Sequence, residues 1–105
     1  MMNVVKTIFA KVGEAAVLEQ LAEESVELAH TALKLARIKR GQNPTPLDEN
    51  KAFRALLEEL GDVRVCLEVL EGRYGPLDTG DVEQVKLKRW MHRLQTFKSL
   101  PDDPT

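Results

Sequence analysis

Residues 52–70 read AFRALLEELGDVRVCLEVL, and this stretch predicts a helix that carries charge on the side expected to be buried. At about 100° per residue its apolar positions fall on one stripe, formed by Ala52, Ala55, Leu56, Val63, Cys66 and Leu70. Glu59 lies within the stripe and Asp62 near its edge, whereas Glu58 projects to the opposite, solvated side. An ionised carboxylate directed into a core is costly unless a partner neutralises it. The stretch therefore indicates an irregular pattern, a buried salt bridge or a cation held between helices.

A second acidic cluster, residues 20–27 (QLAEESVE), opens the strongest amphipathic run of the chain. Glu24 and Glu27 are three residues apart, so they share one face of a helix. Two helices that each carry such a pair of acidic residues either expose them to solvent or use them to bind a metal ion. In the second case Glu24, Glu27, Glu59 and Asp62 would bring four carboxylates to one point. Oxygen ligands with open positions for water suit Mg²⁺, with Mn²⁺ as the alternative, because both are hard cations.

Periodicity and capping signals predict an all-α fold, an antiparallel helical bundle without strands. The predicted helices cover 4–11, 14–40, the segment from the proline loop 42–47 to residue 71, and 81–99. Thr45 is expected to cap the third of these helices, and Asp81 the fourth. Gly41 is expected to end the second of these helices, and Gly72, Gly75 and Pro76 are expected to end the third.

Length and composition predict a single domain over residues 1–105, with 1–13 as an N-terminal arm or short helix and 101–105 as a frayed tail. A net charge of −2 gives no general attraction to nucleic acid or to an anionic membrane. No run is long and apolar enough for a membrane span or a signal peptide. Cys66 is the single cysteine, which favours a reducing, cytoplasmic setting.

The last predicted helix has an apolar stripe and a basic face. Leu87, Trp90, Met91, Leu94 and Phe97 form the stripe, which is expected to join the core. Lys86, Arg89 and Arg93 gather within an arc of about 60° beside it. Alone, this arc is typical of a solvated face. Beside an acidic metal site, it suits a polyphosphate whose charge the metal only partly offsets.

The order and spacing of the acidic motifs resemble the signature of the MazG-like all-α nucleoside triphosphate pyrophosphohydrolases. In that family EExxE is followed, after an interval, by ExxD; here the matches are Glu23-Glu24-x-x-Glu27 and Glu59-x-x-Asp62. Residues 86–89 (KLKR) are similar to the lysine/arginine element of the family's following helix. The resemblance covers roughly residues 13–94. The interval 28–58 is longer than in compact relatives, and the asparagine often found ahead of the lysine element is not evident.

The resemblance implies a reaction, NTP + H₂O → NMP + pyrophosphate, and a role for each matched residue. Glu24, Glu27, Glu59 and Asp62 would be the Mg²⁺ ligands, and Glu23 or Glu27 the catalytic base that activates water. Lys86 and Arg89 would contact the phosphates of the nucleoside triphosphate, with Arg93 and Lys34 as further candidates.

Broad apolar arcs on the predicted helices need a further surface to cover them. We therefore expect homo-oligomerisation, as a homodimer or a dimer of dimers, to complete the bundle. Two other interpretations remain open. One is a carboxylate-bridged di-iron bundle, because Glu27-x-x-His30 matches one of the two Glu-x-x-His motifs that such proteins need. The other is a non-catalytic helical interaction module.

Overall fold

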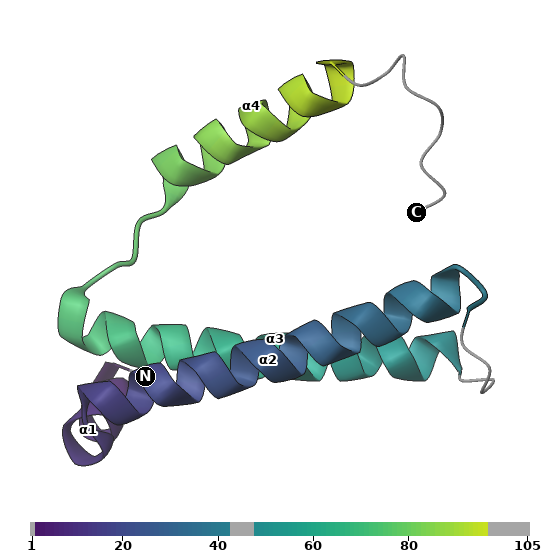
Figure 1. Ribbon diagram of the computed structural model, residues 1–105. Coiled ribbons are helices and arrows are strands. Elements are labelled where there is room, and N and C mark those ends of the chain that lie inside the picture. The colour runs from purple at the N-terminus through teal and green to yellow at the C-terminus, as the bar shows by residue number, and fades with distance from the viewer. Residues whose placement is uncertain (1, 43–47, 97–105) are drawn as a thin grey trace.

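The computed structural model describes residues 2–42 and 48–96, of which 89% are helical and none lies in a strand (Figure 1). The helices follow one another as α1 (Met2–Val12), α2 (Glu14–Lys39), α3 (Glu49–Tyr74) and α4 (Gly80–Thr96). The predicted all-α class is confirmed. Thr45, Phe97 and the expected tail 101–105 lie outside the described residues.

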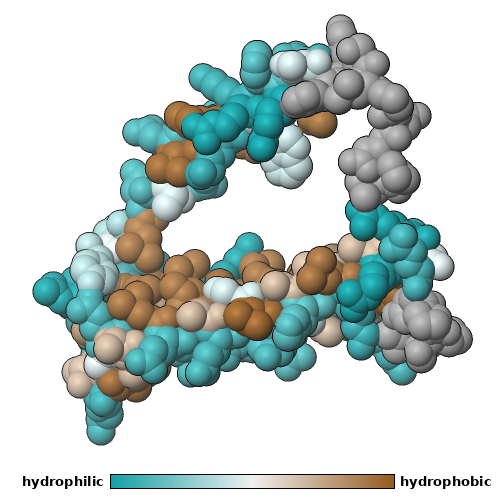
Figure 2. Space-filling model, viewed as in Figure 1, coloured by the Kyte–Doolittle hydropathy of each residue, from teal (hydrophilic) through white to brown (hydrophobic). Residues whose placement is uncertain are grey.

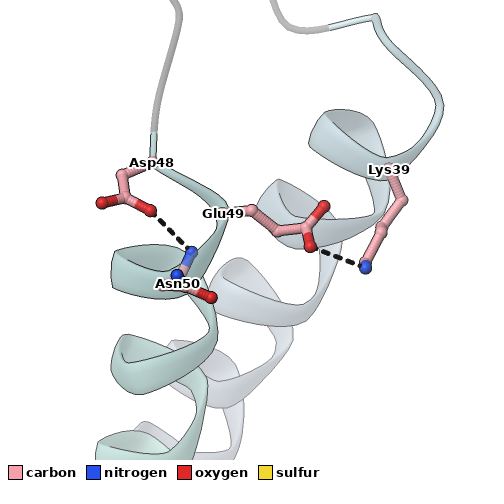
Figure 3. A network of polar contacts seen from close by, with 4 residues as sticks. All are labelled: Lys39, Asp48, Glu49 and Asn50. Carbon is pink, nitrogen blue, oxygen red and sulfur yellow. Dashed lines mark hydrogen bonds and ion pairs between the residues drawn. The ribbon is translucent and has the colours of Figure 1, made fainter.

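Helices α2 and α3 form a long antiparallel hairpin, which positions the acidic residues of both motifs (Figure 1). At the loop end, Lys39 Nζ lies 2.9 Å from Glu49 Oε2, so an ion pair joins the last turn of α2 to the first turn of α3 (Figure 3). At the other end Val17 packs against Val69 and Leu70, which are buried. Phe9, Leu21 and Leu67 extend this apolar cluster.

Helix α1 crosses the open end of the hairpin and packs mainly on α3. Gly13 separates α1 from α2 with φ 92°, a conformation that favours glycine, and its N–H donates to the Phe9 carbonyl. Val5 is the buried residue of α1 and lies over Gly72 of α3. The contact needs glycine there, because an added Cβ would come within 2.7 Å of Val5 Cγ1.

The helix ends differ in detail from the predicted ones. The cap of α3 is Asp48, whose carboxylate accepts a hydrogen bond from the Asn50 N–H at 2.8 Å (Figure 3). Helix α3 does not stop before Gly72 but runs to Tyr74, because Gly72 is retained for packing and Gly75, at φ 76°, forms the end. Asp81 lies in the first turn of α4 rather than capping it.

Helix α4 packs against none of the other three helices (Figure 1). Its apolar stripe was expected in the core, but Leu87, Trp90, Met91 and Leu94 are all more than half exposed, Trp90 by 61%. Periodicity identifies an amphipathic helix correctly but does not say which surface covers its apolar side. Among the described residues, no helix is both long and apolar enough to cross a membrane.

Replacing Gly72 with Ala should destabilise the protein, although alanine is the better helix former. The new methyl group would clash with Val5 and push α1 off α3, at a cost of about 1–3 kcal/mol. The measurement is the free energy of unfolding from urea denaturation. Gly61→Ala is the matched control, because a Cβ at Gly61 meets nothing within 4 Å, and it should be neutral or stabilising by up to about 1 kcal/mol. Equal effects of both changes would contradict the α1 contact.

Candidate metal centre

The two acidic motifs meet half-way along the α2–α3 hairpin. Because the helices are antiparallel and joined at Lys39–Glu49, residues at similar distances from the loop face one another. The same pairing that brings Val17 to Val69 and Leu70 brings the middle of α2, with Glu24, to the middle of α3. The acidic residues are thus held by helix packing rather than by a loop.

Three carboxylates converge at this point: ligand oxygens of Glu24, Glu59 and Asp62 lie within 4.8 Å of one another. Glu24 and Glu59 are partly buried, and Asp62 is exposed. Glu58 is exposed and Glu59 partly buried, as expected, whereas Ala55 of the predicted apolar stripe is exposed. The cluster is open enough for a hydrated ion to reach and for water to complete its coordination.

Among the residues that the structure describes, no cationic side chain forms an ion pair with the three carboxylates. Lys39–Glu49 is the only ion pair within residues 2–42 and 48–96. The pKa of the Glu59 carboxyl is raised above its ordinary 4.5, first because neighbouring atoms displace its water and then because Asp62, Glu24, Glu27 and Glu58 repel its charge. An oxygen donor set with surplus negative charge fits a hard divalent cation such as Mg²⁺ or Mn²⁺.

Two neighbours of the cluster carry further information about it. The Gln20 amide donates to Glu24 Oε1 at 2.7 Å, which holds that carboxylate from the previous turn of α2. Cys66 is buried, and the pKa of its thiol is raised by burial and then by the charges of Glu24 and Asp62. Cys66 therefore stays protonated beside the cluster, where it behaves as a small apolar residue.

The other predicted carboxylates lie nearby but outside the convergent set. Glu27 is exposed, and its charge reaches Glu59, yet its oxygens are not within 4.8 Å of the other three. Glu23 is exposed and lies outside the set as well. His30 is also exposed, and the convergent set has no histidine, so it lacks the mixed ligands of a di-iron bundle.

The predicted phosphate-binding cations are not gathered around the carboxylates within one chain. Lys86, Arg89 and Arg93 line one hollow on α4 with Glu83, Leu87 and Trp90, and α4 stands apart from the hairpin. Lys34 does belong to the hairpin, on α2. Lys34 lines a groove of the hairpin together with Lys51, a residue that no motif of the sequence singles out.

Comparisons of the chain with protein-family models, with curated proteins and with solved structures found no match.

Removing the Glu59 charge should stabilise the metal-free protein. The folded state raises the pKa of Glu59, so ionisation of this carboxyl opposes folding. The protonated carboxyl therefore favours the folded state below pH 4.5, and this contribution to stability is lost as the pH rises through the pKa of the folded state. We expect Glu59→Gln to raise the melting temperature at pH 7 without metal and to abolish any further rise on adding MgCl₂. The measurement is a thermal melt with and without MgCl₂. Glu58→Gln is the neighbouring control and should keep the MgCl₂ response; loss of that response in Glu58→Gln alone would contradict the assignment.

Proposed function

We propose that this protein is a Mg²⁺-dependent nucleoside triphosphate pyrophosphohydrolase that converts an NTP or dNTP and water into the nucleoside monophosphate and pyrophosphate. The observation that carries the proposal is the convergence of Glu24, Glu59 and Asp62, none of which has an ion-pair partner within the described part of the chain. The resemblance of the two acidic motifs to the MazG-like pattern supports the same reaction. Histidine and thiolate are missing from the convergent set, which speaks for hard-cation rather than soft-metal chemistry.

Each acidic residue has a distinct part in this proposal. Glu24, Glu59 and Asp62 would hold Mg²⁺, with Gln20 orienting Glu24. When bound, the ion supplies charge neutralisation to phosphate oxygens and makes a coordinated water more acidic. Glu27 lies close enough to act on the charge of Glu59 yet outside the convergent set, so its carboxylate is free to accept a proton from the attacking water. This favours Glu27 over Glu23 as the base.

A homo-oligomer is part of the same proposal, because one chain leaves much apolar surface uncovered. Figure 2 shows apolar surface running along the α2–α3 hairpin. Exposed large apolar residues of the hairpin include Leu18, Leu33, Phe53 and Leu57.

A non-catalytic interaction module is the second candidate, and the exposed stripe of α4 is the observation that favours it. The two candidates differ in what they expect of Mg²⁺. An enzyme of this type is stabilised by the ion it binds, whereas a module that has no metal site gains nothing from it.

The direct test is a panel of canonical and modified nucleoside triphosphates incubated with MgCl₂ and assayed for released pyrophosphate. We expect hydrolysis of at least one of them, lost with EDTA and lowered roughly 100-fold or more in Glu59→Gln, since even outer residues of metal sites contribute 10–100-fold. Glu58→Gln should stay close to wild type. Release of orthophosphate instead of pyrophosphate, or equal activity in both variants, would overturn the proposal.

The assembly is tested by placing one charge on the apolar surface of the hairpin. Leu57→Glu should shift the protein from dimer or tetramer towards monomer, because an unpaired carboxylate in an apolar interface is costly. Light scattering coupled to size exclusion measures the mass. Gln42→Glu adds the same charge at an exposed position beyond the end of α2 and should leave the mass unchanged. A monomeric wild-type protein would contradict the assembly.

A further inference from the structure

We propose that the α2–α3 hairpin carries its own phosphate-binding groove, formed by Lys34 and Lys51 on the same face as the carboxylate cluster. The inference rests on the proposed function and adds to it the place where the terminal phosphates of the substrate are held. Among the described residues the groove is lined by Thr31, Lys34, Asp48, Lys51, Ala52 and Ala55.

Helix geometry places this groove beside the carboxylates. Lys34 follows Glu24 of the cluster by ten residues, about 15 Å along the axis of α2, and Lys51 precedes Glu59 by eight residues, about 12 Å along α3. On α3, Ala55 precedes Glu59 by one turn, about 6 Å. The groove thus begins one turn from the cluster and extends towards the loop end of the hairpin.

The shape of the groove suits phosphate groups rather than a whole nucleotide. Ala52 and Ala55 have short side chains, which leave space between α2 and α3 where longer residues would fill it. The volume of the groove is about 170 Å³. Pockets that enclose a whole drug-sized molecule measure roughly 300–1,000 Å³. A base and sugar would therefore remain outside the groove.

The charges of the groove also suit an anion. Neither Lys34 nor Lys51 has an ion-pair partner among the described residues, because the nearby Glu49 is taken by Lys39. Figure 3 shows the Asp48 carboxylate directed away from that pair, and one of its oxygens is engaged by the Asn50 N–H. Lys51 lies in the first turn of α3, where the helix dipole adds to its attraction for an anion. The groove thus holds the ammonium groups of Lys34 and Lys51 and a single carboxylate, Asp48, which already accepts a hydrogen bond. The groove is therefore positively charged, and the carboxylate cluster beside it is negatively charged.

This juxtaposition matches a polyphosphate bound with a metal ion. A divalent cation held by Glu24, Glu59 and Asp62 would accept phosphate oxygens in place of water, and the remaining phosphate charge would be offset by cations within reach. Lys34 and Lys51 supply them from the hairpin itself, without α4. The phosphates so held are those that leave as pyrophosphate.

The test is the binding of inorganic pyrophosphate to the full chain, by calorimetry, with and without MgCl₂. Lys34→Gln/Lys51→Gln should weaken binding about tenfold or more, since charge-assisted contacts to phosphate are lost. The matched control is Lys6→Gln/Lys11→Gln, which removes the same charge from α1 and should leave affinity within about twofold. Asp48→Asn removes the carboxylate but keeps a good helix cap, so it should tighten binding. Unchanged binding in the groove variant, or no pyrophosphate binding by the wild type, would overturn the groove.

The metal response separates this proposal from the proposed function. If MgCl₂ stabilises the groove variant as it does the wild type, and pyrophosphate affinity is unchanged, the groove is wrong and the metal site stands. If MgCl₂ stabilises neither protein while pyrophosphate affinity still depends on the two lysines, the phosphate-binding groove is supported and the proposed enzyme is not.

Short single-stranded DNA is the second ligand, because it offers phosphates from a different source. Binding of DNA with the same lysine dependence, in place of pyrophosphate, would overturn the polyphosphate assignment.

Discussion

The antiparallel contact between α2 and α3 determines what this chain can do, because both acidic motifs are placed by its register. The register is held at one end by the Lys39–Glu49 ion pair and at the other by Val17 against Val69 and Leu70. A shift of α3 by one residue would rotate its side chains by about 100° and carry Glu59 away from Glu24. The small apolar cluster at the open end is thus as important for the carboxylates as their own positions in the sequence.

The same packing forces like charges together, and the hairpin tolerates this because the cluster is only partly buried. Water screens Asp62, which is exposed, and the Gln20 amide donates to Glu24. The remaining electrostatic repulsion acts mainly on Glu59, whose pKa is raised by lost hydration and by four neighbouring carboxylates. A cation would remove this repulsion, so binding energy and fold stability are coupled at one side chain.

Much of the hairpin follows from periodicity within single helices. The phase that separates Glu59 from Glu58 and the cationic end of α2 are both readable from the sequence, and both are confirmed. Features that depend on two elements are not readable in this way. From the sequence, Gly72 is predicted to end a helix, whereas in the structure it makes room for Val5 of α1. Lys51 looks like an ordinary surface residue until the hairpin register places it beside Lys34. The convergence of Glu24 with Glu59 and Asp62, but not with Glu27, likewise needs the crossing geometry of both helices.

The position of α4 separates its basic residues from the carboxylate cluster of the same chain. The sequence concentrates Lys86, Arg89 and Arg93 on α4, yet α4 contacts neither α2 nor α3 of its chain, and Trp90 and Leu94 beside them stay exposed. Those cations reach an acidic cluster only if assembly brings α4 onto a second chain, since their apolar neighbours have no surface to cover within one chain. Lys34 and Lys51, in contrast, are fixed beside the cluster by the fold of a single hairpin. Under the proposed function, retention of a polyphosphate and closure of the site around it would be separate tasks, the first performed by the hairpin alone and the second dependent on a partner chain.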